Sequence, residues 1–375
     1  MNENPLKQVQ SFGQSIWLDD IHRKLIVSGD LQRLIEEDGV RGMTSNPAIF
    51  EKAIVDSHEY DQDIRSMKIA GKGTTAIYET LTQGDVKSAA DVFRHLYDKT
   101  QGQDGYVSLE VNPHLAHDAT GTIAEARRLW AELHRPNVFI KVPATAEGLI
   151  AIRQLITEGI NVNVTLLFGL PRYRQVAEAY LAGIEARLAL GKPVKYVASV
   201  ASFFVSRIDA LVDPLLDKLI AQGGKEVILA KQAKGQIAIA SAKAAYQIYK
   251  DIFDGERFRL AAAHGARVQR LLWASTSPKN PDFSDVKYIE ALIGKHTVNT
   301  VPPKTLAAYR DHGQPKARLE QDEQEVLRLL EQLTELGISI DTVTRQLEDE
   351  GVEKFIKPFD KLMATLAKAD AERAP

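Results

Sequence analysis

Short apolar runs recur along the chain, and between them apolar residues return every three or four positions. The first pattern predicts buried strands, and the second predicts helices that cover them. Val138, Ile140 and Val142, for example, alternate with Phe139 and Lys141 in one such run. We predict eight strands, at residues 15–19, 40–45, 105–111, 137–142, 160–166, 195–201, 268–274 and 296–301.

Sequence signals for the start or end of a helix lie between several of these runs. The helical signals are residues 28–38 before Gly39, a Thr-Ile-Ala-Glu capping box at 122–125, and residues 146–158 before Gly159. Strand–helix alternation favours a parallel sheet, and eight repeats favour a closed (β/α)8 barrel, also called a TIM barrel. A doubly wound open sheet is the alternative, but no GxGxxG follows the first strand.

Two connections are long and helical in pattern, near residues 47–103 and 203–267, and the chain after residue 301 is helical as well. We therefore expect one barrel domain over residues 1–375, with helical insertions in the second and sixth strand-to-strand connections and additional helices at the C-terminus. A chain of 375 residues is long for one hydrophobic core, but barrels of this kind reach more than ~400 residues.

Composition narrows the functional class. The net charge is −3, so no global field favours nucleic acid or an anionic membrane. No apolar run reaches the ~18 residues of a membrane span, and the N-terminus lacks the pattern of a secretory signal. Cysteine is absent, which excludes disulfides and thiolate metal sites. We expect a cytoplasmic protein.

Polar residues gather where the predicted strands end, which is where barrel active sites lie. They are Asp19, Asn46, Glu110, Lys141, Asn163, Thr165, Ser202 and Ser275. Alternation agrees with a shared direction, because Glu110 opposes Leu109 and Val111 along its strand. We expect these side chains to meet at the mouth of the barrel.

Lys141 defines the candidate chemistry. A lysine amine becomes a nucleophile only if its pKa falls from ~10.4 to about 7–8, which desolvation achieves. It then forms a Schiff base with a carbonyl substrate without a metal. A nearby carboxylate favours the charged amine and opposes this effect. A lone lysine in a strand is more often a surface residue, so the hypothesis depends on the joint placement of Lys141, Glu110, Thr165 and Asp19.

Other motifs are weaker evidence for a functional site. The His114, His117 and Asp118 cluster has metal-like spacing, but no further ligand follows, and we expect structural roles. The sequence GKGTT at 71–75 lacks the spacing of a phosphate-binding P-loop. Phosphate binding is better sought at Arg207, after the sixth strand, and in residues 275–280, after the seventh.

The chain resembles the transaldolases. The motifs that carry the resemblance are MTSNPAIF at 43–50, VSLEVNP at 107–113, NVFIKVPAT from residue 137, INVNVTLLF from residue 160 and VASVASFFVSRID at 197–209. They occur in the family's order along nearly the whole chain. The WLDDIHR opening and the EGVEKFIKPFDKL stretch near the C-terminus resemble the longer subgroup.

The resemblance implies a (β/α)8 barrel and assigns the catalytic roles. The Schiff-base lysine of the family lies on the fourth strand, where Lys141 falls. Asp19, rather than Asp20, corresponds to the acid that takes a proton from a substrate hydroxyl. Glu110 and Thr165 correspond to the pair that handles the catalytic water.

The resemblance also implies the residues that bind substrate, namely Asn46, Asn163, Ser202, Phe204, Arg207, Ser275 and Lys279. Arg207 is expected to bind the phosphate. Many family members carry an arginine two residues after the serine of the seventh strand, but this chain has Ser277 there and Lys279 as the nearest cation. Lysine binds phosphate as a point charge rather than as a bidentate partner.

The implied reaction transfers a dihydroxyacetone unit from sedoheptulose 7-phosphate or fructose 6-phosphate to an aldose phosphate in the pentose phosphate pathway. It needs no cofactor and no metal, and the family makes a homodimer plausible. One alternative is an aldolase that cleaves fructose 6-phosphate and releases free dihydroxyacetone. Another is a catalytically silent barrel that only binds sugar phosphates.

Overall fold

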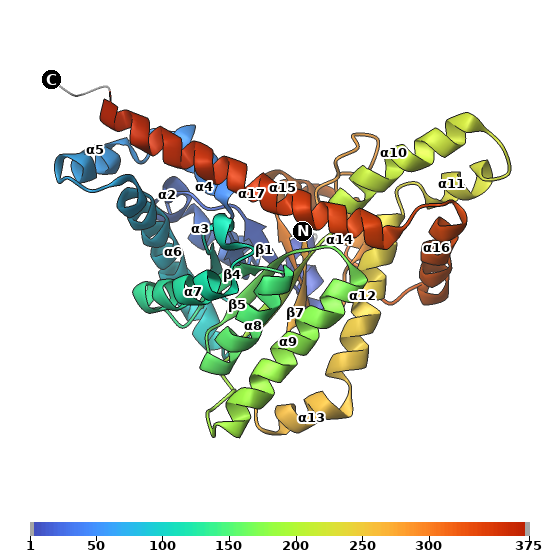
Figure 1. Ribbon diagram of the computed structural model, residues 1–375, viewed down its shortest axis with the longest axis horizontal. Helices are drawn as coiled ribbons and strands as arrows, with labels where there is room; N and C mark the ends of the chain where they lie inside the picture. Colours follow the sequence, from blue (N-terminus) through green and yellow to red (C-terminus); the bar gives the residue numbers. More distant parts are fainter. Residues whose placement is uncertain (1–3, 372–375) are drawn as a thin grey trace.

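Eight parallel strands close into a barrel in a computed structural model that describes residues 4–371 (Figure 1). Neighbouring strands follow chain order, and β8 pairs with β1 to close the barrel. The strands are β1 (Gln14–Asp19), β2 (Gly42–Thr44), β3 (Tyr106–Glu110), β4 (Val138–Pro143), β5 (Val162–Leu167), β6 (Ser199–Phe204), β7 (Arg270–Ala274) and β8 (Thr297–Val301). The predicted (β/α)8 fold is confirmed.

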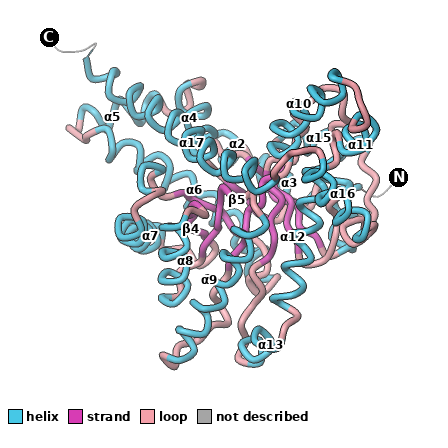
Figure 2. The backbone as a smooth tube through the Cα atoms, turned by 45° about the vertical axis from the view of Figure 1, so that its right-hand side comes forward, coloured by secondary structure: helices cyan, strands magenta, loops and turns pink. Residues whose placement is uncertain are grey.

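Helices surround the strands, as the tube view shows (Figure 2). In the first half of the chain they are α1 (Pro5–Gln8), η1 (Val9–Phe12), α2 (Arg23–Val27), α3 (Asp30–Glu37), α4 (Pro47–Val55), α5 (Asp61–Ile69), α6 (Thr74–Lys99), η2 (Pro113–Leu115), α7 (Ala119–Leu133) and α8 (Ala146–Glu158). In the second half they are α9 (Leu170–Ala189), α10 (Ser206–Gln222), α11 (Val227–Ala233), α12 (Ile237–Phe253), α13 (Glu256–Ala263), α14 (Lys287–Ala291), α15 (Pro303–His312), α16 (Glu323–Glu335) and α17 (Ile340–Ala371). No helix in the described range is long and apolar enough to cross a membrane.

The two long connections are helical, as the sequence pattern predicts. Helices α4 to α6 lie between β2 and β3, and α10 to α13 lie between β6 and β7. The 32-residue helix α17 crosses the upper side of the molecule in Figure 1 and packs against α4, α6 and α10. These three helices come from the two insertions, so the C-terminal helix joins them over one end of the barrel.

The structure corrects three details of the prediction. Strand six begins at Ser199 and not at residue 195, because Tyr196 is exposed and precedes the strand, so the sixth connection starts after Phe204. The capping box at 122–125 is wrong: Asp118 caps α7, and the hydroxyl of Thr122, inside the helix, donates to the carbonyl of Leu115. The helix expected over residues 28–38 is α3 and begins only at Asp30, because Gly29 before it adopts a left-handed conformation.

Strand β4 is fixed at its end by the start of α8. Thr145 caps α8, and its hydroxyl oxygen accepts from the amide of Gly148 at 3.0 Å. Gly148 must lack a side chain, because a Cβ there would lie 1.9 Å from the carbonyl oxygen of Pro143. Val138, Ile140 and Val142 are fully buried, while Lys141 faces the barrel between Glu110 of β3 and Asn163 of β5. Close strand-to-helix packing therefore fixes the position of Lys141.

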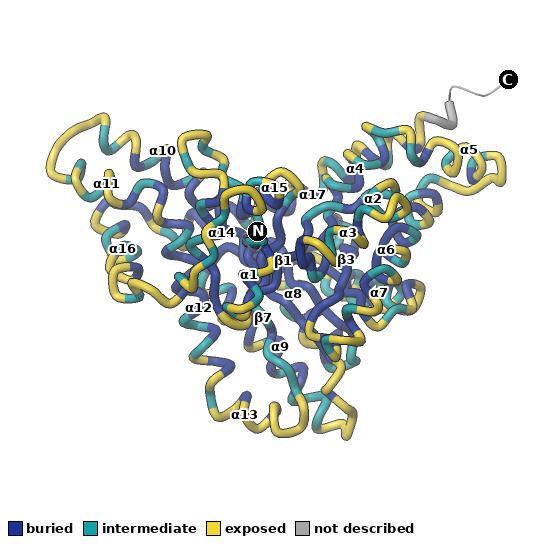
Figure 3. Tube along the Cα trace, turned by 180° about the vertical axis from the view of Figure 1, so that it is seen from behind, coloured by how far each residue is buried: buried dark blue, intermediate teal, exposed yellow. Residues whose placement is uncertain are grey.

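The strand residues are buried except for Asp19 and Arg270, which are half-buried, and fully exposed positions lie in the surrounding helices and loops (Figure 3). Toward the amino ends of the strands, the barrel interior is aromatic. Trp17 stacks on Phe139, and Phe139 stacks on Tyr106 at 4.3 Å between ring centroids. Asn163 and Ser108, joined by a 3.0 Å hydrogen bond, lie higher along their strands. The interior thus changes from apolar to polar toward the carboxyl ends of the strands.

Candidate active site

A cavity of about 270 Å³ lies at the carboxyl ends of the strands. It is lined by Asp19, Thr44, Asn46, Lys141, Thr165, Ser202, Phe204, Arg207, Ala274, Ser275, Ser277, Lys279, Thr300, Pro302 and Phe355. Nine of the eleven residues singled out by sequence line it, which is every one except Glu110 and Asn163. The geometry therefore brings together residues from seven strands, from the segments that follow them, and from α17.

Lys141 lies in the wall of this cavity and is almost fully buried, with 4 % of its surface exposed. Its Nζ donates to the carbonyl oxygen of Ser45 at 3.0 Å and lies 3.5 Å from the nearer carboxylate oxygen of Glu110. The ring of Phe355 covers the amine, with its centroid 5.3 Å from Nζ. The lysine therefore reaches the cavity from an environment that excludes water.

Glu110 lies beside Lys141 but does not line the cavity. Burial raises the pKa of Glu110 from 4.5 to about 7, against the opposing effect of the Lys141 charge. Among residues 4–371, neither carboxylate oxygen has a hydrogen-bond partner, and neither does the buried hydroxyl of Thr165. Buried polar groups normally find partners, so these oxygens are poised for a small polar molecule or a transferring proton.

Asp19 is held at the end of β1 by a short polar chain. Thr44 donates its hydroxyl to Asp19 at 2.7 Å and lies 2.6 Å from the hydroxyl of Thr300. Burial raises the pKa of Asp19, and the hydrogen bond from Thr44 and the charges of Lys141 and nearby cations act in the opposite direction. Asp19, and not Asp20, lines the cavity, as predicted from the register.

Two cations line the part of the cavity formed by β6 and β7. Arg207 packs over the ring of Phe204 at 5.3 Å, and its buried Nη1 has no hydrogen-bond partner in the part of the chain that the structure describes. Burial lowers the pKa of Arg207. The pKa of Lys279 is lowered by burial and then by the positive charge of Arg207. Lys279 therefore approaches Arg207 from the loop after β7, and Ser277 lines the same cavity.

Asn163 lies one layer deeper than the sequence led us to expect. Its amide donates to the hydroxyl of Ser108 at 3.0 Å and accepts from Ser202 at 2.7 Å. Ser202 lines the cavity, whereas Asn163 does not. In this geometry Asn163 orients Ser202.

Asn46 also has a second role, because its side-chain oxygen caps α4 through the amide of Ile49.

The backbone around the cavity is irregular at two points. Leu166 has φ +57° beside a register shift in the pairing of β5 with β6, and Ser275 has φ +55° at the end of β7. Positive φ is uncommon for residues other than glycine, and such strain gathers at functional sites. Thr165 lies within this shift, between Val164 and Leu167, and bulges of this kind re-aim neighbouring side chains.

Sequence reasoning missed Thr44, Thr300 and Phe355. The two threonines stand at strand ends, so alternation along β2 and β8 carried a signal for them. Phe355 comes from α17, far from the barrel in sequence. The motif that contains it was noted only for its resemblance, and no local pattern places its ring over Lys141.

The histidine cluster after β3 has structural contacts. His114 pairs with Asp360 at 2.7 Å, His117 pairs with Glu147 at 3.3 Å, and Asp118 caps α7. Within residues 4–371, no group of three or more histidine, cysteine or acidic side chains gathers as a metal site.

The fold and the lysine-centred cavity define a class of protein, the (β/α)8 barrels with a buried lysine at the carboxyl ends of the strands. Within this class, the model of the Transaldolase/Fructose-6-phosphate aldolase family matches residues 16–366, and the chain belongs to that family.

Curated relatives cover nearly the full chain. A protein named Transaldolase 2 from Nostoc sp. (strain PCC 7120) is 48 % identical over 97 % of this chain and 97 % of its own length. Proteins named Transaldolase from Trichodesmium erythraeum and Thiobacillus denitrificans are 47 % and 45 % identical, over 98 % and 97 % of this chain and 97 % and 99 % of their own lengths. This full-length similarity bears out the predicted family and enzyme class, a transferase, over the two alternatives.

Proposed function

We propose that this chain transfers a dihydroxyacetone unit from a ketose phosphate to an aldose phosphate through a Schiff base on Lys141. The observation that carries the proposal is the placement of the Lys141 amine, buried in a cavity wall beside a carboxylate whose pKa is about 7. Sedoheptulose 7-phosphate and fructose 6-phosphate are the proposed donors. Erythrose 4-phosphate and glyceraldehyde 3-phosphate are the proposed acceptors.

Lys141 begins the reaction as the nucleophile. Its neutral amine attacks C2 of the ketose, and loss of one water from the resulting carbinolamine gives the iminium. Glu110 suits the proton transfers of this step, because a pKa near 7 lets it donate and accept protons at neutral pH. Thr165, whose hydroxyl has no partner within residues 4–371, would hold the water involved.

Asp19 then serves as the base for carbon–carbon cleavage. It takes the proton of the C4 hydroxyl, the C3–C4 bond breaks, and the electron pair moves into the iminium to give an enamine on Lys141. The aldose phosphate leaves as an aldehyde. The enamine adds to the acceptor aldehyde through the reverse steps, and hydrolysis of the new iminium frees Lys141. Burial of the amine under Phe355 favours transfer, since it keeps water from the enamine.

Substrate binding divides between two ends of the cavity. Arg207 and Lys279 are the proposed phosphate ligands, with Ser275 near them, and Phe204 forms an apolar wall. Asn46 and Ser202 are the proposed ligands of the substrate hydroxyls, with Asn163 orienting Ser202. The departure at Ser277 leaves Arg207 as the cation able to bind the phosphate in a bidentate manner.

A steady-state assay separates transfer from release. With fructose 6-phosphate alone, we expect little free dihydroxyacetone, and addition of erythrose 4-phosphate should produce sedoheptulose 7-phosphate and glyceraldehyde 3-phosphate together. Equal dihydroxyacetone release with and without acceptor would show an aldolase instead. Calorimetric binding of the sugar phosphate with no turnover would show a silent barrel.

Two further expectations from the sequence belong to this proposal. We propose a cytoplasmic location, in keeping with the absence of cysteine and with sugar phosphates as substrates. We also propose a homodimer, which sedimentation equilibrium of the full chain tests through its mass.

A further inference from the structure

A second and larger cavity, of about 710 Å³, lies at the opposite end of the barrel. Its walls are the segments that lead into the strands: residues 10–15 before and within β1, residues 101–104 before β3, and the turns before β7 and β8. Its buried floor is formed by Trp17, Tyr106 and Phe139. A volume of this size lies within the range of small-molecule sites, about 300–1,000 Å³.

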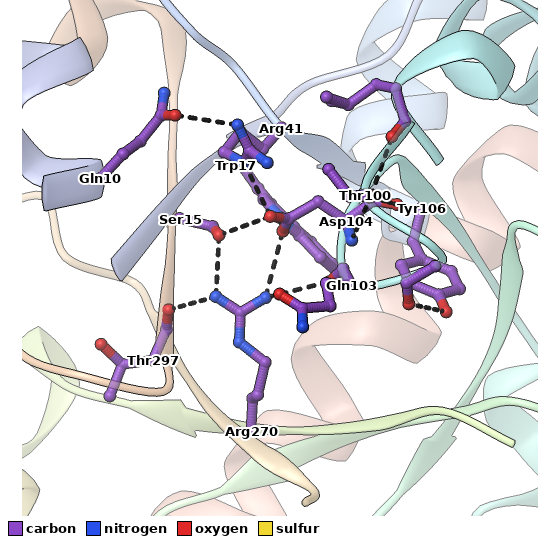
Figure 4. A network of polar contacts seen from close by, with 12 residues as sticks. Gln10, Ser15, Trp17, Arg41, Thr100, Gln103, Asp104, Tyr106, Arg270 and Thr297 are labelled. Carbon is purple, nitrogen blue, oxygen red and sulfur yellow. Dashed lines mark hydrogen bonds and ion pairs between the residues drawn. The ribbon is translucent and has the colours of Figure 1, made fainter. Parts of the chain in front are cut away.

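Asp104 organises the cationic side chains of this cavity (Figure 4). One carboxylate oxygen accepts from Trp17 Nε1 at 3.2 Å and from Arg270 at 3.1 Å, and the other accepts from Ser15 at 2.9 Å and from Arg41 Nε at 2.7 Å. Asp104 is thus fully engaged and holds two guanidinium groups, one on each side.

Further contacts hold the same two arginines in place. Arg270 also donates to Ser15 at 2.8 Å and to the carbonyl of Thr297 at 2.6 Å, and Arg41 donates to the side chain of Gln10 at 2.8 Å. Figure 4 shows both guanidinium groups turned toward Asp104 from different elements. This preorganisation means that little side-chain entropy is lost when a ligand binds.

The lining carries more positive than negative charge. Arg41, Arg267, Arg270 and Lys295 bring four positive charges, and Asp104 is the one acidic residue among the lining residues, so the surplus is three. Lys295 is exposed, and no hydrogen bond or ion pair of its ammonium group is found within residues 4–371. The pKa of His296 is lowered, first by burial and then by Arg270 and Lys295. An unneutralised cationic cavity attracts anions.

Gln14 provides a second, independent indication of a ligand. It is 1 % exposed, it lines the cavity, and its side-chain oxygen has no hydrogen-bond partner among the described residues. A buried acceptor without a partner calls for a donor on the ligand, such as a hydroxyl. The site therefore suits a molecule that combines several negative charges with a donor group.

We propose that this cavity is a binding site for a multivalent phosphate compound, separate from the active site at the other end of the barrel. Lys295 and Arg41 bind the phosphate groups, and Arg270, whose terminal nitrogens already donate to protein groups, contributes its positive charge. Gln14 accepts from a hydroxyl. Three surplus positive charges match a ligand with two or more negative charges. Guanidinium groups prefer phosphate because their paired donors fit its oxygens.

Isothermal titration calorimetry of the full chain tests the proposal with pyrophosphate, ATP and citrate as probes. The Arg207→Gln variant serves as the background, because it weakens phosphate binding at the active site and leaves the second cavity intact. Pyrophosphate should bind this background, and added Lys295→Glu should weaken binding at least 10-fold. Lys225→Glu, the same charge change in the exposed loop between α10 and α11, should weaken it less than twofold.

Comparison of the three probes identifies the class of ligand. Tighter binding of ATP than of pyrophosphate would indicate an organic phosphate, and the reverse would indicate an inorganic one; either supports the site. Citrate binding as tight as that of pyrophosphate would overturn the preference for phosphate. No binding to the Arg207→Gln background, or equal binding with and without Lys295→Glu, would show that the arginines have only a structural role at the amino ends of the strands. Lys295→Glu alone should leave kcat unchanged, because Lys295 lies outside the catalytic cavity.

Discussion

Replacement of Glu110 by glutamine should change how the stability of the protein depends on pH. The pKa of Glu110 is about 7 in the folded chain and 4.5 when the residue is solvated, and burial is the main cause. A folded-state pKa above the unfolded value means that the folded state binds the proton more tightly. The resulting stabilisation is complete below pH 4.5 and is lost as the pH rises through 7.

The magnitude follows from the two pKa values. Their difference corresponds to about 3 kcal/mol, most of which is lost between pH 5 and pH 8. Glutamine cannot ionise, so Glu110→Gln does not suffer this loss. The stability of the variant relative to wild type should therefore rise by roughly 2–3 kcal/mol from pH 5 to pH 8, whatever its difference from wild type at pH 5.

Urea denaturation at the two pH values measures this change, since each midpoint and slope give a free energy of unfolding. Glu335→Gln, an exposed glutamate of α16, is the matched control and should differ from wild type equally at both pH values. A constant difference between Glu110→Gln and wild type would refute the reasoning. It would show that the Glu110 carboxyl is solvated in the folded protein and is not tuned for proton transfer at neutral pH.

Three further substitutions test the proposed roles. Asp19→Asn should lower kcat by about 100-fold or more, and borohydride should then trap the whole sugar phosphate, because cleavage is blocked after the iminium forms; a three-carbon adduct at the normal rate would refute the role. Arg207→Gln should raise KM for fructose 6-phosphate by about 10-fold or more with a smaller effect on kcat, because it removes charge-assisted hydrogen bonds; an unchanged KM would place the phosphate elsewhere. Phe355→Leu should increase release of free dihydroxyacetone relative to transfer, measured with and without acceptor, because less apolar surface covers Lys141; an unchanged ratio would show that Phe355 only packs.

The sequence predicted most of the fold because the barrel repeats one simple pattern. Strand β5 shows why, since Asn163 and Thr165 alternate with Val162 and Val164 and so indicate an inner and an outer face. Strand β6 shows the limit of this signal. All six of its residues are buried, so no alternation marked where it began, and the prediction started four residues early.

The site was predictable where chemistry lies at strand ends and was not where it depends on tertiary contacts. Lys141 and Asp19 follow from the strand pattern alone. Phe355 does not, because only the packing of α17 across the barrel brings it to the amine. The second cavity was also invisible, since Arg41, Asp104 and Arg270 each read as ordinary polar residues until the closed barrel placed them around one space.

Borohydride trapping tests the central claim most directly. The full chain is incubated with fructose 6-phosphate, reduced with borohydride, and examined by intact mass and peptide mapping. We predict one reduced dihydroxyacetone adduct, located on the peptide that contains Lys141 and absent from Lys141→Met. An adduct on Lys279, the other lysine of the cavity, would contradict the account. So would the absence of any adduct from folded protein that still binds the sugar phosphate.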